Sequence, residues 1–186
     1  MKKYIVQSLR LTLVLLVLLS VIYPIGIALA SKLAKGNGGG EVVEKNGKKV
    51  GYARLGQRFT RSEYFWGRPS AVDYNAAGSA GSNKGPSNTA YLQEVQSRID
   101  TLMKYNPEIK KSDIPADMVT ASGSGLDPDI SEQGAAIQIA RVAKARNIPA
   151  AKVKALVSLN TLKPFLGLFG PTTVNVLQVN LALDRL

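Results

Sequence analysis

An uncharged run of 21 residues, Leu11–Ser31, limits what this chain can fold into more than any other feature of its sequence. At 1.5 Å of rise per residue, a helix of that length spans roughly 31 Å, close to the thickness of the hydrocarbon core of a bilayer. No second apolar stretch of the sequence approaches this length. The run therefore predicts one transmembrane helix, which Pro24 is expected to kink or to mark near its outer end.

The N-terminal segment has two interpretations, a retained anchor and a cleaved signal. Lys2, Lys3 and Arg10 resemble the basic region of a secretory signal, and Ala28–Ala30 has the spacing of a cleavage site. The apolar core of such a signal is usually only about 7–15 residues long, so we expect an uncleaved anchor. Because basic flanks tend to stay in the cytoplasm, residues 1–10 are predicted to be cytoplasmic. The remaining chain is then expected outside the bacterial inner membrane, in the periplasm or its equivalent.

The 155 residues after the apolar run have the length of one domain with a single core. They carry 21 basic and 13 acidic side chains, a formal charge of +8, without a block of five like charges. We interpret this as a solvated surface, although diffuse positive charge also attracts anionic lipid or an acidic partner. The few aromatic residues are not interleaved with basic ones, so no nucleic-acid partner is expected.

The residue types needed for most catalytic chemistry are missing from this sequence. It contains no cysteine and no histidine, which removes thiolate ligands and the usual base of a catalytic triad. Ser124 lies between glycines, but the G-x-S-x-G pattern fails because residue 122 is serine. A calcium loop beginning at Asp127 fails because Glu132 and Gln138 stand where glycine and glutamate are needed. We therefore predict no catalytic residue and no metal ligand.

The pattern along the chain predicts an α+β fold, with one N-terminal transmembrane helix followed by one domain of a small sheet and helices. The glycine-rich residues 32–49 are expected to form a flexible linker, and residues 50–186 the extracytoplasmic domain. Strands or a hairpin are predicted within 49–59, 117–121 and 172–179, and helices over 89–105, 132–146, after Pro149, and as a turn at 181–186. The stretches 73–88 and 122–131 are predicted to be irregular.

Several side chains are assigned local roles by their positions. Asn88 and Ser131 precede predicted helices and are expected to cap them. Arg141 lies towards the C-terminal end of the second of these helices, where a positive charge complements the helix dipole. Trp66, beside two other aromatic residues, is interpreted as a core anchor next to a turn, with an interface hot spot as the alternative.

Motifs along nearly the whole chain resemble the C subunit of the Kdp-type potassium-transporting P-type ATPase. The matching segments keep the order and spacing of that family. They are Tyr64-Phe65-Trp66-Gly67-Arg68-Pro69-Ser70, Tyr74-Asn75, Gly81-Ser82-Asn83, Gly85-Pro86-Ser87-Asn88, Val119-Thr120-Ala121-Ser122, Ser124-Gly125-Leu126-Asp127-Pro128, Arg141-Val142-Ala143, Val174-Asn175-Val176-Leu177 and Ala182-Leu183-Asp184.

The resemblance implies a non-catalytic subunit that stabilises a high-affinity potassium-uptake complex. Its implied partners are a potassium-channel-like subunit, a P-type subunit that hydrolyses ATP, and membrane lipid. It also implies a role as a catalytic chaperone that raises the affinity of the pump subunit for ATP, with Gln138 taking part. From the residues alone, Gln138 lies inside a predicted helix, where an ordinary polar contact is expected. No cofactor is expected to bind this chain directly, and ATP enters only through the pump subunit.

Two irregular stretches, residues 73–88 and 122–131, are predicted to lie at or near the interface with the partner subunits, because both are polar and lack a catalytic constellation. The competing hypotheses from other classes are a secreted or anchored hydrolytic domain and a solute-binding module at the membrane surface.

Overall fold

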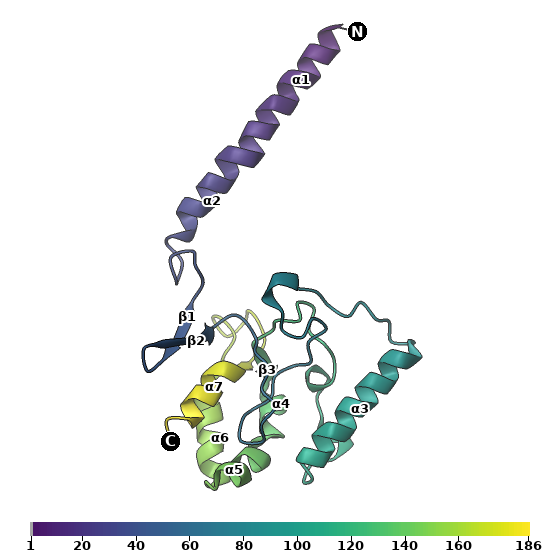
Figure 1. The fold of residues 1–186 in the computed structure, drawn as a ribbon, viewed down its shortest axis with the longest axis vertical. Helices are drawn as coiled ribbons and strands as arrows, with labels where there is room; N and C mark the ends of the chain where they lie inside the picture. Colours follow the sequence, from purple (N-terminus) through teal and green to yellow (C-terminus); the bar gives the residue numbers. More distant parts are fainter. Residues whose placement is uncertain (1) are drawn as a thin grey trace. The chain divides into compact units, whose positions relative to one another are not determined.

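The computed structural model describes residues 2–186 (Figure 1). The chain forms two compact units, the first ending at Val42 and the second running from Val43 to Leu186. The first contains the apolar helix, and the second contains the remaining helices and two small antiparallel sheets. The predicted α+β class is confirmed.

The apolar segment is one unbroken helix from Lys2 to Ser31, long and apolar enough to cross a membrane. It consists of α1 (Lys2–Val17), a π-helical turn (Leu18–Ile22) and α2 (Tyr23–Ser31). The predicted span is therefore helical, but the helix begins nine residues before Leu11. Pro24 does not end it. The wider turn just before Pro24, in which the Tyr23 N–H bonds to the Leu18 carbonyl, is the kind of local adjustment that lets a helix continue past proline.

A two-stranded hairpin lies earlier than the sequence pattern indicated. Strands β1 (Val42–Lys45) and β2 (Lys48–Tyr52) are joined by Asn46-Gly47, whose φ angles are 54° and 72°. Two successive positive φ angles at Asn-Gly are typical of the two-residue turn that matches the twist of a hairpin. Regular structure thus begins inside the predicted linker 32–49, and the predicted strands at 49–59 are displaced towards the N-terminus.

The second sheet is small and antiparallel, with strand order β3-β5-β4. It contains β3 (Asp129–Ser131), β4 (Thr161–Leu162) and β5 (Thr173–Asn175), and Val174 lies opposite both Ile130 and Thr161. The predicted strand 172–179 is wrong beyond Asn175, because the chain turns there into α7 (Val176–Leu183). The Asn175 side chain caps this helix by accepting a hydrogen bond from the Gln178 N–H. The predicted strand 117–121 is also wrong and contains a 3-10 turn, Ala116–Met118.

The predicted helix 89–105 is confirmed as α3 (Thr89–Tyr105), with Asn88 as its cap. The predicted helix 132–146 is two helices, α4 (Glu132–Ala136) and α5 (Ile139–Arg146), and the Ser131 cap is confirmed. The interruption falls at Gln138, where a buried side chain pairs with another segment. The helix after Pro149 is α6 (Ala150–Leu159). Short 3-10 turns lie at Ala76–Gly78 and Lys111–Asp113.

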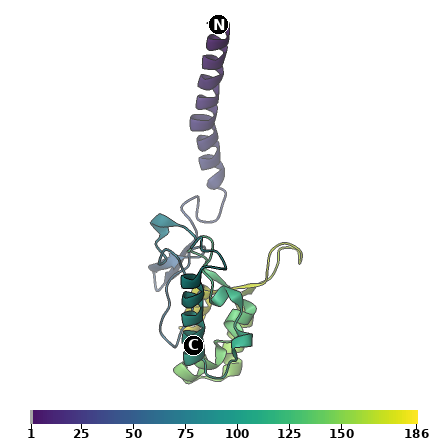
Figure 2. The same cartoon turned by 90° about the vertical axis from the view of Figure 1, so that its right-hand side faces the viewer.

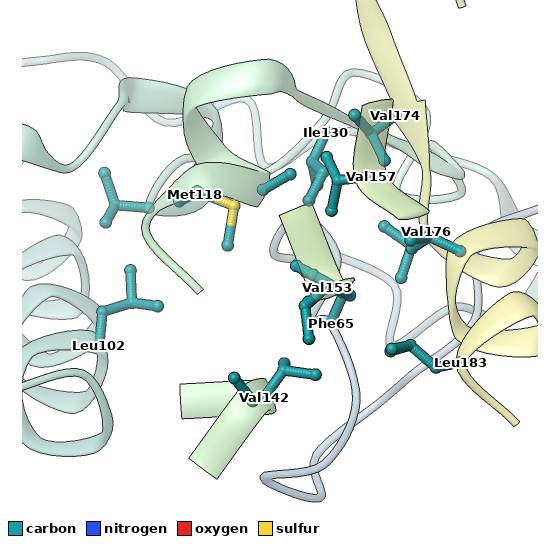
Figure 3. Close-up of a cluster of buried hydrophobic side chains, with 14 residues drawn as sticks. Phe65, Leu102, Met118, Ile130, Val142, Val153, Val157, Val174, Val176 and Leu183 are labelled. Carbon is teal, nitrogen blue, oxygen red and sulfur yellow. The ribbon is translucent and has the colours of Figure 1, made fainter. Parts of the chain in front are cut away.

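The core of the second unit surrounds Phe65, a residue in no helix or strand (Figure 3). Its side chain is fully buried, whereas the neighbouring Trp66 is half-buried and packs against the core. The other members come from α3 to α7, from the three-stranded sheet and from the 3-10 turn at 116–118 with the residue after it, and include Leu102, Met118, Ile130, Val142, Val153, Val157, Val174, Val176 and Leu183. An irregular segment thus forms the centre around which the regular elements pack.

Candidate functional site

The Phe65–Trp66 backbone runs between two buried amide side chains. On one side, the Phe65 N–H donates to Asn180 Oδ1 at 2.8 Å, and Asn180 Nδ2 donates to the Phe65 carbonyl at 3.0 Å. The next residue is held in the same way. The Trp66 N–H donates to Gln138 Oε1 at 2.8 Å, and Gln138 Nε2 donates to the Trp66 carbonyl at 3.2 Å. Each amide therefore supplies the donor and acceptor that a neighbouring strand would otherwise supply.

Gln138 has further partners that fix its orientation. Nε2 also donates to the Gly134 carbonyl at 2.9 Å, and Oε1 accepts a bond from Arg141 Nη2 at 2.5 Å. The side chain is completely buried. The predicted polar contact of Gln138 is thus observed, and its partners are the backbone of Trp66 and Gly134 together with Arg141. In this conformation, both amide atoms are occupied by contacts within the domain.

The prediction that Arg141 lies towards the C-terminal end of a helix is wrong, because α5 begins at Ile139 and Arg141 is in its first turn, where it is buried. Its guanidinium donates to the carbonyls of Ser62 (2.6 Å) and Tyr64 (3.0 Å) and to Asn106 Oδ1 (3.2 Å), and it lies 4.2 Å from the centre of the Trp66 ring. Burial lowers the pKa of Arg141 to about 10, so it stays charged near neutral pH. Carbonyl and amide oxygens, together with an aromatic face, compensate the charge. The three-residue spacing of Gln138 and Arg141 was the available sequence signal that these side chains share a face.

A second set of contacts joins the end of α5 to both termini of the second unit. Arg146 donates to the carbonyls of Glu63 and Leu183 and to Asp184 Oδ1, the last at 2.7 Å. Asp184 Oδ2 also accepts a bond from Lys45 of β1 at 2.7 Å. Burial acts to raise the pKa of Asp184, but the hydrogen bonds from Lys45 and Arg146 outweigh it and hold that pKa below its ordinary range. We call Gln138, Arg141, Arg146, Asn180 and Asp184 the polar clamp.

The two irregular stretches predicted to form an interface lie side by side in the structure. The Ala80 N–H and the Ser79 hydroxyl both donate to the Ser124 carbonyl, each at 3.0 Å. Gly125 has a φ of 67°, and a Cβ there would lie 2.5 Å from Val72 Cγ2 and 2.9 Å from the Ala80 carbonyl oxygen. Only glycine allows this approach without strain. Residues 73–88 thus lie against the turn 122–125, and we call the exposed residues of these two stretches the paired-loop surface. The prediction of an irregular stretch over 122–131 is wrong beyond Pro128, because residues Asp129–Ser131 pair with β5 as strand β3, where Ile130 is buried.

A cleft of about 520 Å³ lies between α3 and the segment that the polar clamp holds. Its lining includes Arg68, whose Nη1 pairs with Asp127 at 2.8 Å, and Tyr74, whose hydroxyl donates to the Arg68 carbonyl at 2.5 Å. Burial raises the pKa of the Tyr74 hydroxyl, which is therefore neutral at physiological pH. The cleft thus has an aromatic and basic lining, in which each of three arginines is paired with a carboxylate: Arg58 with Asp73, Arg68 with Asp127 and Arg98 with Glu94.

The chemistry available to these residues is recognition. Within residues 2–186, no group of three or more acidic, histidine or cysteine side chains is arranged to hold a metal ion. Asp127 is paired with Arg68, and Asp129 accepts a hydrogen bond from Asn175. Ser124 is occupied by the turn itself, since its hydroxyl accepts the Leu126 N–H. The polar groups mostly bond to the domain's own backbone, as expected of a rigid scaffold.

The chain is similar to known proteins over almost its full length. Residues 5–185 match the family model described as "KdpC: K+-transporting ATPase, c chain". The "Potassium-transporting ATPase KdpC subunit" of Flavobacterium johnsoniae is 60% identical over 186 residues, with 99% of both chains covered. The proteins of the same description from Flavobacterium psychrophilum and Phocaeicola vulgatus are 56% and 52% identical, with 99% and 98% of both chains covered.

These matches show that the chain is a non-catalytic accessory subunit of a potassium-transporting ATPase. The chain belongs to the KdpC family, and it is a subunit of the Kdp complex.

Proposed function

We propose that this subunit stabilises the assembly of the potassium-translocating and ATP-hydrolysing subunits of the Kdp complex. The observation that carries the proposal is the paired-loop surface. Residues 73–88 and the turn 122–125 are far apart in sequence, and hydrogen bonds from Ser79 and Ala80 to Ser124 bring their exposed, largely polar residues together. A rigid, irregular surface on a packed scaffold is typical of sites that bind other proteins.

A pair of glycine variants tests this role. Gly125→Ala places a Cβ against Val72 and Ala80 and should separate the two loops, whereas a Cβ at Gly123 meets nothing within 4 Å. We expect Gly125→Ala to reduce co-purification of the other subunits and potassium-stimulated ATPase activity by roughly tenfold, because a loss of about 1–3 kcal/mol is typical of such strain. Gly123→Ala should leave both unchanged. Intact assembly and transport in Gly125→Ala, with confirmed loop displacement, would reject the proposal.

For the membrane arrangement, we propose that residues 11–31 span the bacterial inner membrane, with residues 1–10 in the cytoplasm and the C-terminal domain outside. The supports are the exposed apolar surface of the Lys2–Ser31 helix and the basic residues that precede the span. The chain has no cysteine, so a single Ser112→Cys variant reports topology without background. Ser112 is exposed and lies outside the proposed interface. An impermeant maleimide added to intact spheroplasts should label Ser112→Cys and leave Ser8→Cys unlabelled. The reverse pattern would place the domain in the cytosol.

We further propose that Gln138 affects the complex by holding the Trp66 segment, and that any rise in ATP affinity of the pump subunit is indirect. Support comes from the complete burial of Gln138 and the occupation of both its amide atoms. Gln138→Glu keeps the acceptor for the Trp66 N–H and for Arg141 but loses the donor. If the effect is structural, Gln138→Glu should lower complex recovery and leave the KM for ATP of the recovered complex unchanged. A raised KM in a fully assembled complex would instead support the direct nucleotide role.

A further inference from the structure

The connection between β4 and β5 exposes an apolar tip that the functions above do not use. Residues 164–171 read PFLGLFGP, and this hairpin extends from the body of the second unit as the yellow-green loop in Figure 2. Four large side chains at its tip are mostly exposed, by 71% for Phe165, 75% for Leu166, 81% for Leu168 and 65% for Phe169. Core side chains of the same types, such as Phe65 and Leu183, are at most 1% exposed.

The tip is an ordered turn. Phe165 and Phe169 exchange backbone hydrogen bonds, with N···O distances of 2.8 and 3.0 Å, so the two phenylalanines stand opposite each other. Leu166 has a backbone φ of 53°, a value that residues other than glycine and asparagine rarely adopt. A solvent-exposed turn usually has a polar residue or glycine at such a position. The leucine thus indicates a surface that contacts something apolar.

The segment of sequence that contains the hairpin carries charges of one sign. Residues 133–183 contain six arginines and lysines and no aspartate or glutamate. Three of these cations, Lys152, Lys154 and Lys163, lie in α6 or at the base of the hairpin and are exposed. An anionic bilayer has negatively charged head groups outside and apolar acyl chains within. Exposed lysines and an apolar tip are complementary to these two layers.

The connection between the two units is short. Only residues 32–42 separate the end of the apolar helix at Ser31 from the second unit, and 11 residues reach at most about 40 Å when fully extended. With the helix anchored in lipid, contact of the tip with the same bilayer is an intramolecular event with a high effective concentration. Weak insertion of a few side chains is then sufficient to hold the tip at the bilayer.

We propose that the Phe165–Phe169 tip inserts into the interfacial region of the bilayer that holds the N-terminal helix, as a second membrane contact of this subunit. The inference rests on the proposed anchoring by residues 11–31. A protein partner fits less well, because four side chains at the end of a narrow hairpin do not offer the roughly 800 Å² that a stable interface takes from each partner. Insertion would restrict rotation of the domain about its glycine-rich connection.

Quenching of tryptophan fluorescence by brominated acyl chains tests the insertion. The full chain is reconstituted alone into vesicles of phosphatidylcholine with a minority of phosphatidylglycerol, brominated or not. Leu168→Trp places a reporter in the tip, Ala90→Trp places a matched one at an exposed position of α3, and the wild type gives the background of Trp66. Since both leaflets carry bromine, the orientation of the chain does not affect the result.

We expect quenching in Leu168→Trp to exceed that of the wild type by roughly twofold or more, with Ala90→Trp close to background. Equal quenching at both positions, or none at either, overturns the inference. If the Trp at position 168 becomes protected from solvent only after the other subunits are added, the tip contacts a protein, and this result also overturns the inference. Failure of the wild type to float with vesicles contradicts the anchor itself, whereas flotation without tip quenching contradicts only the hairpin contact.

Discussion

In the polar clamp and in the Phe165–Phe169 tip, the usual distribution of polar side chains outside and apolar side chains inside is reversed. In the clamp, Gln138, Arg141 and Asn180 are buried and bonded to the backbone of another segment. In the tip, Phe165 and Leu168 are largely exposed and contribute nothing to the core. Buried polar groups stabilise a fold only when their partners are present, and exposed apolar groups are retained where a further contact uses them. The first region thus holds the subunit together, and the second is available to its surroundings.

The two phenylalanines give the sharpest form of this comparison. Phe65→Ala removes a fully buried ring from the centre of the core and should lower the free energy of unfolding by about 3–5 kcal/mol. Phe165→Ala removes a ring that is 71% exposed and should change it by less than about 0.5 kcal/mol. Urea unfolding of the full chain in detergent, followed by circular dichroism, measures both. Similar losses in the two variants would mean that the tip packs on the domain.

Arg141→Met tests the charged member of the clamp. The variant keeps much of the side-chain volume but leaves the Ser62 and Tyr64 carbonyls and the amide oxygens of Asn106 and Gln138 without their donor. We expect a loss of about 3 kcal/mol in the free energy of unfolding. Lys144→Met, at an exposed position of the same helix, is the control and should change stability by less than about 0.5 kcal/mol. Equal effects would show that the buried guanidinium contributes no net stability.

Gln138→Leu asks how much the amide itself contributes. Leucine has a similar size but leaves the Trp66 N–H and carbonyl unpaired in a buried site. The expected loss is about 2 kcal/mol, smaller than for Arg141 because only one of the hydrogen bonds lost, the one from Arg141, involves a charged group. In this variant, the rate of hydrogen exchange should also rise more at the Trp66 amide than at the Val157 amide of α6. An unchanged exchange rate at Trp66 would contradict the clamp.

The smallest expected effect concerns Asp184 and acid. Because the pKa of Asp184 is lowered in the folded state, its contribution is fully present above its ordinary pKa of 3.8 and is lost as the pH falls through the folded value. The wild type should therefore lose stability below about pH 4, and Asp184→Asn should lose less over the same range. At pH 7, the variant should be less stable by about 1 kcal/mol or less, as for partly exposed ion pairs. Parallel pH profiles of the two proteins would exclude the proposed role of Lys45 and Arg146.

Elements set by local sequence were predicted well. Helix α3 follows from its apolar spacing, its Asn88 cap and Asn106-Pro107 after it, and the structure confirms both of its ends. The β1–β2 hairpin also has a local signal, Asn46-Gly47, but the glycine-rich stretch before it led to the prediction of a linker. Both elements depend on contacts between residues close in sequence, so a single sequence is sufficient to find them.

Elements set by distant contacts were predicted poorly. The break between α4 and α5 places Gln138 opposite Trp66, 72 residues away. The β-branched residues Val176 and Val179 favour a strand, yet they lie in α7, where their burial against the core outweighs local preference. The pairing of Asn180 with Phe65 was not predicted, because an asparagine in an apolar stretch gives no sign of the backbone it will meet.

The sequence by itself determined the apolar helix, the absence of thiol and imidazole chemistry, and the family to which the chain belongs. Tertiary structure alone decided that residues 73–88 lie against the turn 122–125 and that Arg141 is buried. It also decided that the apolar residues of the 164–171 hairpin remain outside the core. The physical reason is that helix propensity and residue chemistry act over a few neighbouring positions, whereas burial and hydrogen-bond pairing depend on which distant segment occupies the adjoining space.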